Sequence, residues 1–320
     1  MRVAVVGAGG VGGYFGGKLA QGGLDVVFIA RGNTLEALRT RGLRVDSING
    51  DFTLAPVNAT DDPASGGKVD VILVAVKAWQ IPDAIAHLDP MLHGETAVIP
   101  LENGLTAPDD IARILGPGHA LGGLCAIVSF VVEPGHIRHA AVEPRITFGE
   151  LDNRPTDRVL RIAEQFQRAG VKADVAPDIH RSMWTKFLFI APYSAIGAAS
   201  RVPIGVWRSI PETRALVAGL IREVLALAHA RNVALAPDAF ERTMQRYDAL
   251  AADAIPSLQR DVMQGKPSEL DAQLGAVVRM ARESGVAVPL FETLHAALLP
   301  QEQMARRPVE DSRPRLSGLK

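Results

Sequence analysis

Short apolar runs separated by helical segments fill the first half of the chain. Seven of these runs are rich in β-branched residues and lie at residues 2–6, 25–30, 69–76, 96–100, 120–128, 145–148 and 171–175. Strands that alternate with helices are typical of a parallel sheet, and strands that are apolar throughout are typical of a sheet covered on both faces. The pattern predicts a doubly wound α/β sheet over residues 1–176.

Two segments inside this region predict antiparallel pairing instead. Residues 42–57 are expected to form a hairpin that turns at Asn49-Gly50, because both residue types accept the positive φ of a tight turn. Residues 127–142 contain Pro134-Gly135, another turn dipeptide, and are expected to form antiparallel strands that complete the sheet.

From Asp178 onward the pattern is helical almost without interruption. Stretches rich in alanine and leucine, such as residues 212–231 and 269–284, predict helices. The expected breaks are Pro203, Pro211, Pro237, Pro256, residues 265–267 and Gly285. The sequence therefore predicts an all-α C-terminal domain over residues 177–303. Residues 304–320 mix arginines, prolines and small polar residues and are expected to form a flexible tail.

The first apolar run leads directly into a glycine-rich motif. It reads Gly7-Ala8-Gly9-Gly10-Val11-Gly12, which is the Gly-x-Gly-x-x-Gly pattern of Rossmann-type dinucleotide sites. Gly7 allows a tight turn, Gly9 lets the backbone approach a pyrophosphate, and Gly12 lets the next helix pack on the strand. Because a strand precedes the motif and a helix and a second strand follow it, we interpret it as a phosphate site rather than an empty glycine turn.

Polar residues follow the other expected strands at the points where they end. Arg31, Lys77 and Asn103 are these residues, and ligands of a doubly wound sheet bind at the carboxyl ends of its strands. We therefore expect all three to gather with the glycine loop on one edge. An acid after the second strand is typical of NAD sites, whereas Arg31 suits the 2′-phosphate of NADPH/NADP+. The simpler alternatives are a solvated arginine, a first loop lysine and turn chemistry at Asn103-Gly104.

Composition and charge describe an ordinary soluble protein. Hydrophobic residues make up 48% and charged residues 22%, and 34 basic against 35 acidic side chains give a net charge of −1. We expect no nucleic-acid partner. A single cysteine, Cys125, allows no intrachain disulfide and fits a reducing compartment. Neither a signal peptide nor a membrane span is evident, so we expect a cytoplasmic protein.

Several short motifs occur in a characteristic order along the chain. After the glycine loop and Arg31 come Val-Lys77-Ala-Trp-Gln, Glu-Asn103-Gly, Phe-Gly-Glu150, Trp184-Thr-Lys186, and Ser257-Leu-Gln-Arg-Asp-Val followed by Glu269-Leu-Asp. In this set the chain resembles the ketopantoate reductases (2-dehydropantoate 2-reductases), up to about Leu294. The resemblance implies NADPH-dependent reduction of a small-molecule 2-keto acid, above all 2-dehydropantoate to pantoate in pantothenate biosynthesis.

The resemblance also implies roles for individual residues. Lys186 is the general acid toward the forming alkoxide, and Glu269 lies near it, the substrate hydroxyl and the cofactor. Ser257 holds the substrate carboxylate, while Lys77 and Asn103 line the cofactor and substrate site. Taken singly, Lys186 also fits an amphipathic-helix lysine, Glu269 a first-turn acid and Ser257 a helix cap. As an ordered set, we interpret them as functional.

Two positions differ from the family pattern on the helix that follows Lys186. The family carries substrate-contacting asparagines four and eight residues on, where this chain has Ile190 and Ser194. An aliphatic side chain cannot replace an amide's hydrogen bonds, and Pro192 between them removes a helical amide and is a candidate kink. Later, Leu274-Gly275 replaces Asn-Gly. A more apolar 2-keto acid is therefore an alternative substrate.

Other functions stay open at this point. An opine-type dehydrogenase would reduce an imine instead and would need an amine, and a non-catalytic NADP(H)-sensing module would bind the cofactor without turnover. A flavin site would also use the glycine loop and would colour the protein yellow. His136 and His139 have too few companions to predict a metal site. The apolar helical faces suggest a homodimer by analogy alone.

Overall fold

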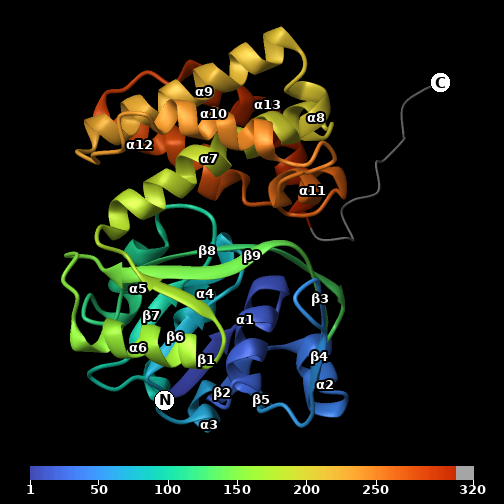
Figure 1. Ribbon diagram of the computed structural model, residues 1–320, viewed down its shortest axis with the longest axis vertical. Coiled ribbons are helices and arrows are strands. Elements are labelled where there is room, and N and C mark those ends of the chain that lie inside the picture. Colours follow the sequence, from blue (N-terminus) through green and yellow to red (C-terminus); the bar gives the residue numbers. More distant parts are fainter. Residues whose placement is uncertain (308–320) are drawn as a thin grey trace. The chain divides into compact units, whose positions relative to one another are not determined.

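The structure is a computed structural model that describes residues 1–307 of the 320-residue chain. Its contacts divide the chain into two compact units, with the boundary between Met183 and Trp184. The N-terminal unit contains β1 (Arg2–Val6), α1 (Gly10–Gln21), β2 (Asp25–Ile29), α2 (Gly32–Thr40), β3 (Leu43–Ser47), β4 (Phe52–Leu54), β5 (Ala59–Thr60), α3 (Pro63–Gly66), β6 (Val71–Val74), η1 (Ala78–Gln80), α4 (Ile81–Ile85), η2 (Asp89–Met91), β7 (Ala97–Pro100), α5 (Ala107–Leu115), β8 (Leu121–Glu133), β9 (His136–Glu150), α6 (Asp157–Arg168) and β10 (Lys172–Val175) (Figure 1).

Five parallel strands form the first sheet, in the order β5-β2-β1-β6-β7. When these five strands are numbered along the chain, their order in the sheet is 3-2-1-4-5. The order in which the chain adds strands reverses between β1 and β6, as in a Rossmann-type sheet. The pairing places Ile29, Val6, Val74 and Pro100 on one rung. These residues end their strands, so the four following loops leave the same edge. The predicted fold class and the predicted gathering of these loops are both confirmed.

The first sheet is buried on both faces by separate apolar clusters. Val3 and Val5 belong to one cluster with residues of α1 and of the second sheet. Ala4 and Val6, which point to the opposite face, belong to the other cluster, with residues of α4 and α5. Strands between two covered faces need apolar residues at every position, which explains the continuous apolar runs in the sequence.

A second five-stranded sheet departs from the single sheet expected from the sequence. β8 and β9 form a long antiparallel hairpin that turns at Pro134-Gly135, and β3 and β4 form the expected hairpin at Asn49-Gly50. The other edge of β9 pairs in parallel with β3 and then with β10. Side-chain periodicity indicates which residues are buried, but it does not indicate which strands are neighbours in a sheet. The sequence analysis therefore missed the division into two sheets, and it also missed the two-residue strand β5.

The C-terminal unit is helical, as predicted. Helix α7 (Ile179–Ser200) enters it and is followed by α8 (Ile204–Trp207), α9 (Pro211–Ala230), α10 (Ala239–Ala249), α11 (Ser257–Met263), the π-helical η3 (Asp271–Gly275), α12 (Ala276–Ser284) and α13 (Pro289–Ala305) (Figure 1). Pro203, Pro211 and Pro256 lie at helix starts, and Gly285 ends α12 in the left-handed conformation. Helix α13 includes Met304 and Ala305 of the segment expected as a tail, and residues 308–320 lie outside the described part.

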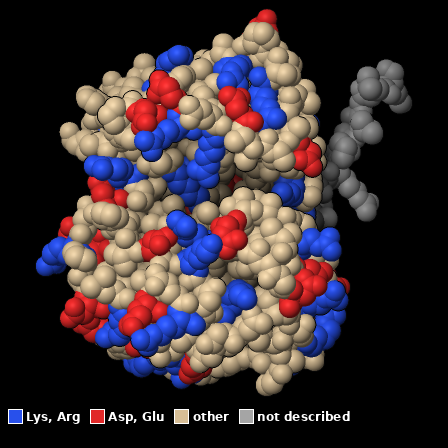
Figure 2. All heavy atoms as spheres, in the orientation of Figure 1, with Lys and Arg blue, Asp and Glu red and all other residues tan. Residues whose placement is uncertain are grey.

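Charged side chains of both signs lie on the face drawn in Figure 2. Acidic and basic side chains are interspersed over most of the face drawn in Figure 2, in keeping with the net charge of −1. Within residues 1–307, no helix is both long enough and apolar enough to cross a membrane.

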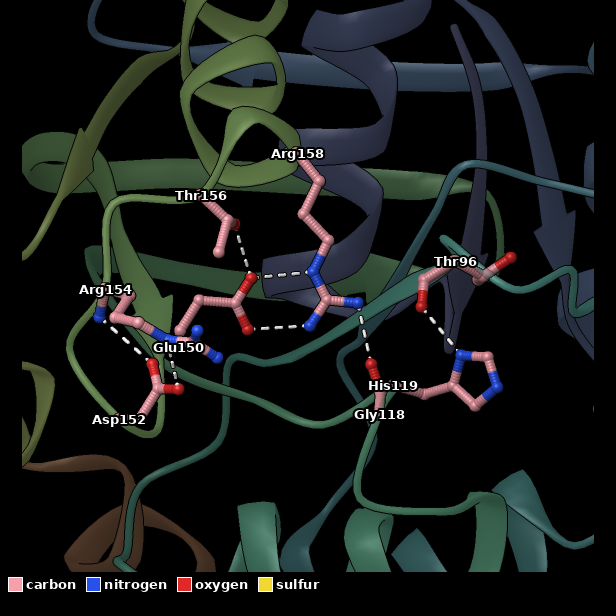
Figure 3. Close-up of polar contacts among 8 residues, drawn as sticks. All are labelled: Thr96, Gly118, His119, Glu150, Asp152, Arg154, Thr156 and Arg158. Atoms are coloured by element: carbon pink, nitrogen blue, oxygen red, sulfur yellow. Dashed lines mark hydrogen bonds and ion pairs between the residues drawn. The ribbon is translucent and has the colours of Figure 1, made fainter.

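A buried ion pair joins β9 to α6 in the N-terminal unit (Figure 3). Glu150 ends β9 and accepts hydrogen bonds from Arg158 Nε at 2.7 Å, Arg158 Nη2 at 2.6 Å and Thr156 Oγ1 at 2.6 Å. Arg158 Nη1 also donates to Gly118 O at 2.7 Å. The two charged side chains are only 10% and 13% exposed. The Glu150 that the sequence offered as a family motif therefore has a structural role: it fixes α6 against the sheet.

Replacing this carboxylate is expected to destabilise the N-terminal unit. Glu150→Gln leaves the Arg158 guanidinium buried without its charge partner, which costs about 3–5 kcal/mol at pH 7. Burial alone raises the pKa of Glu150, but the bonds from Arg158 and Thr156 outweigh it and hold the pKa below its usual value. The stabilisation is therefore present above the ordinary value of 4.5 and lost as pH falls through the lower folded pKa.

Urea unfolding of the wild type and of Glu150→Gln at pH 7 and at pH 3 tests this expectation. The difference between their free energies of unfolding is expected to be smaller at pH 3. Glu164→Gln is the matched control, since Glu164 lies on the same helix and its pair with Arg168 is exposed. Equal effects of the two substitutions at pH 7 would argue against a structural role for the buried pair.

Candidate functional site

The glycine loop joins β1 to α1 and is shaped by close backbone contacts. Gly7 has φ +95°, and a Cβ there would lie 2.7 Å from Ala75 O. Gly12 is more confined, since a Cβ would lie 2.0 Å from Gly7 O. A Cβ at Gly9, by contrast, would meet no atom within 4 Å. Packing therefore requires the two outer glycines, while Gly9 borders open space.

The start of α1 suits an anionic group. The helix begins at Gly10, and no acidic residue in its first turn offsets the helix dipole. A Cβ at Gly10 would lie 2.7 Å from Ser129 O, so the same turn packs closely on β8. Ala8 is buried and Val11 is half-buried between the glycines. The open space at Gly9 and the unopposed helix start together fit the pyrophosphate of a dinucleotide.

Arg31 follows β2 and caps the start of α2. The side chain is exposed, and within residues 1–307 its guanidinium has neither a hydrogen-bond nor an ion-pair partner. No acidic residue lies in the first turn of α2. A free guanidinium at this edge of the sheet can bind a phosphate through paired N–H donors, whereas the acid typical of an NAD ribose site is absent from this position.

Glu102 connects the ends of β6 and β7 and was not singled out from the sequence. Its carboxylate accepts hydrogen bonds from Val76 N at 3.2 Å and from Leu101 N at 3.0 Å. Glu102 therefore holds in place the two loops that carry Lys77 and Asn103. The Lys77 ammonium lies 5.9 Å from the centroid of the Trp79 ring. The acidic residue directly before Asn103 was the available signal, but its bonds to a neighbouring strand end are visible only in the fold.

Helix α7 carries three of the residues selected from the sequence. Lys186, Ile190 and Ser194 lie four residues apart and therefore share one side of the helix. Lys186 and Ile190 are half-buried, while Ser194 is 0% exposed and its hydroxyl has no partner among the described residues. Helix α7 continues through Pro192 to Ser200.

An aromatic cluster holds the middle of α7. The rings of Phe189, Tyr193, Trp207 and Tyr247 pack with centroids 5.1–6.2 Å apart. The Tyr247 hydroxyl donates to Phe189 O at 2.6 Å, close to Pro192, which cannot donate a backbone hydrogen bond. Burial raises the pKa of Tyr193 and of Tyr247, so both phenols stay protonated. This cluster fixes the helical segment beside Lys186.

A clamp from the last helix holds the segment around Glu269. Glu269 is only 6% exposed and directly follows Ser268. The Glu302 carboxylate accepts hydrogen bonds from Ser268 N at 3.0 Å and from Ser268 Oγ at 2.6 Å. Arg306 pairs with Glu302 at 2.7 Å and donates to Ser268 O at 3.0 Å. Sequence reasoning missed Glu302 and Arg306, because Ser268, the residue that both of them bind, is more than 30 residues away.

Ser257 and the turn after Glu269 complete the set in the helical unit. Ser257 is the first residue of α11 and is half-buried. The segment Asp271–Gly275 is π-helical, a distortion that is frequent at functional sites. Gln273 within it is 0% exposed, and neither of its amide atoms has a partner among the described residues. Leu274 and Gly275 lie in the same turn.

His136 and His139 form side-chain contacts within the second sheet. His136 Nε2 lies 2.8 Å from Asp46 Oδ2, and His139 Nδ1 lies 2.9 Å from Ser47 Oγ. In the part of the chain that the structure describes, no group of three or more His, Cys, Asp or Glu side chains has the arrangement of a metal site.

The selected residues thus fall into two sets by structural unit. The glycine loop, Arg31, Lys77 and Asn103 lie in the N-terminal unit, at one edge of the parallel sheet. Lys186, Ile190, Ser194, Ser257 and Glu269 lie in the helical unit. The first set has the features of a dinucleotide site. The second combines a half-buried lysine with a buried glutamate.

Comparison with known proteins gives matches along most of the chain. A family model described as "Ketopantoate reductase PanE/ApbA" matches residues 3–153, and its C-terminal counterpart matches residues 178–302. A 2-dehydropantoate 2-reductase of Nostoc sp. is 34% identical over 304 residues, which cover 93% of this chain and 94% of that protein. The uncharacterized oxidoreductase YkpB of Bacillus subtilis is 32% identical, covering 93% and 98%.

A solved structure agrees with the fold over nearly its whole length. The crystal structure of a 2-dehydropantoate 2-reductase from Geobacter metallireducens superposes with a TM-score of 0.88 at 31% identity. The match covers 94% of this chain and 99% of that one.

Proposed function

The chain belongs to the ketopantoate reductase family, and from this membership we propose that it reduces a 2-keto acid to a 2-hydroxy acid with NADPH. The leading substrate is 2-dehydropantoate, whose reduction gives pantoate for pantothenate and coenzyme A biosynthesis. The Nostoc and Geobacter relatives are named for this reaction. The comparisons support an oxidoreductase of this family. The identity of the cofactor and of the substrate is our proposal.

One observation carries the cofactor assignment. The parallel register puts the ends of β2, β1, β6 and β7 on one rung, and the glycine loop and Arg31 leave that edge. The open space at Gly9 admits a pyrophosphate, and the Arg31 guanidinium, which has no partner within residues 1–307, suits a 2′-phosphate. These features support NADPH over NADH.

The chemical step assigned to this chain is proton delivery. When bound, NADPH supplies the hydride that the keto carbon accepts, and the carbonyl electron pair moves to oxygen. We assign the Lys186 ammonium to that oxygen, where it stabilises the developing negative charge and then transfers a proton to give the hydroxyl. By resemblance, Glu269 lies beside that hydroxyl, and Ser257 holds the substrate carboxylate. The Glu302 clamp keeps Glu269 in a fixed backbone setting.

A second candidate substrate is favoured by Ile190. This half-buried aliphatic residue lies one turn after Lys186, where an amide would serve a polar substrate group, and Ser194 beyond it contributes no exposed surface. A substrate hydroxyl facing Ile190 would lose a hydrogen bond, at a cost of about 1–3 kcal/mol if it is buried. A 2-keto acid with an apolar side chain has no hydrogen bond to lose at that position.

Consumption of NADPH by the purified protein tests the proposal. The panel contains 2-dehydropantoate and 2-keto acids with larger apolar side chains, each with and without added amines, and each repeated with NADH. We expect amine-independent turnover that is faster with NADPH. Preference for an apolar acid would move the assignment to that substrate, and turnover that requires an amine would indicate an opine-type dehydrogenase. NADPH binding with no turnover would indicate a sensor.

A further inference from the structure

Arg246 on α10 is set apart from the other arginines around it. Its guanidinium carbon lies 4.0 Å from the centroid of the Phe189 ring. Arg242, one turn earlier, pairs with Asp238, and Arg214 pairs with Asp248. Within residues 1–307, Arg246 has no carboxylate partner and donates no hydrogen bond. Its charged end therefore presents a full set of unused donors.

The ring that Arg246 covers lies on the same helix as Lys186. Phe189 is three residues after Lys186 on α7, so the ring that Arg246 covers comes from the helical turn that follows the lysine. Phe189 packs in turn on Tyr193 and Tyr247, with centroids 5.7 and 5.1 Å away. The ring that Arg246 covers is thus held rigidly, and it holds the plane of the guanidinium.

The Arg246 side chain is only partly desolvated. The side chain as a whole is exposed, yet desolvation lowers the pKa of its guanidinium. Both observations hold if the charged end lies among protein atoms and water still reaches it. A guanidinium that has no carboxylate partner among the described residues and still meets water can bind an anion from solution. The Arg246 guanidinium, beside the α7 turn that follows Lys186, therefore suits a small anion.

We propose that Arg246 binds the carboxylate of the 2-keto acid and so selects acids over neutral ketones. This inference rests on the proposed function, in which Lys186 serves the adjacent keto oxygen. A guanidinium stacked on an aromatic ring keeps its edge free, and two parallel N–H groups on that edge match the two oxygens of a carboxylate. Arg246 is then a specificity residue in addition to Ser257.

Kinetics with an acid and its ester test this role. We expect Arg246→Gln to raise KM for 3-methyl-2-oxobutanoate by about 10- to 100-fold, with kcat changed by less than about 3-fold. With the methyl ester, wild type and variant are expected to behave alike, since the ester carries no charge. Arg242→Gln is the matched control on the same helix and is expected to change neither constant. An unchanged KM, or an equal loss with acid and ester, would overturn the assignment.

Calorimetry with 3-methyl-2-oxobutanoate in the presence of NADP+ separates this inference from the proposed function. Binding by wild type that Arg246→Gln weakens would support the inference even if no turnover is seen. Turnover by wild type with no effect of Arg246→Gln would remove Arg246 alone and leave the proposed function. If wild type neither binds nor turns over this acid or 2-dehydropantoate, both the inference and the proposed function would be overturned.

Discussion

Lys186→Ala is expected to lower kcat by about 10²- to 10⁴-fold while the Kd for NADPH stays nearly unchanged. Positioned general acids contribute this much, because they act on charge that develops only in the transition state. Lys186 is half-buried on a helix segment fixed by the Phe189 and Tyr247 contacts, so its loss leaves the surrounding fold intact. Steady-state kinetics with the best acid of the panel, together with fluorescence titration of NADPH, would measure both quantities.

Two further variants identify what the lysine supplies. Lys186→Arg keeps the positive charge but is a poor proton donor near neutral pH, so it is expected to recover substrate binding and little of kcat. Lys266→Ala removes an exposed lysine from the same unit and is expected to have wild-type constants. A near-normal kcat for Lys186→Ala would remove Lys186 from the chemistry, whatever the other variants show.

Gly12→Ala is expected to unfold or severely destabilise the N-terminal unit, whereas Gly9→Ala is expected to keep the fold and lose cofactor affinity. A Cβ at residue 12 would lie 2.0 Å from a backbone oxygen, so α1 must move off β1. The cost exceeds the about 1–3 kcal/mol of ordinary overpacking, because backbone rather than a flexible side chain is in the way. A Cβ at Gly9 meets nothing in the protein but projects into the space assigned to the pyrophosphate.

Thermal melts of both variants with and without NADPH distinguish the two glycines. Gly9→Ala is expected to melt like wild type without NADPH and to lose the stabilisation that NADPH confers on wild type. Gly12→Ala is expected to melt far lower in both conditions, or to be insoluble. Gly9→Ala that binds NADPH as wild type does would remove Gly9 from the cofactor site.

The glycine loop also shows which part of a motif can be interpreted from the sequence. The spacing of Gly7, Gly9 and Gly12 predicted a turn, an open approach and a close helix contact, and the backbone has a geometry suited to each. These requirements are local, since they depend on residues within one strand, turn and helix. The roles of Lys77, Asn103 and Arg31 toward a ligand stay predictions, although the fold brings their loops to one edge.

Sequence analysis did not predict the interactions between distant segments. Glu102 bridges two strand ends, Glu302 holds Ser268 from the last helix, and Arg246 stacks on a ring of another helix. These three residues are glutamates and an arginine, which are residue types that are common on protein surfaces. Their partners are selected by chain packing over tens of residues, which neither periodicity nor spacing records.

The sequence by itself determined the parallel sheet, the helical second unit and the chemistry offered by each strand end, because burial on two faces and helical periodicity leave a direct imprint on residue type. Only the tertiary structure decided that the strands form two sheets, since β9 pairs in parallel with β3 and β10 through backbone groups that every residue carries. It likewise decided which charges are paired: Glu150 pairs with Arg158, while Arg246 has no carboxylate partner within residues 1–307. Charge pairing depends on distances that only the folded chain sets.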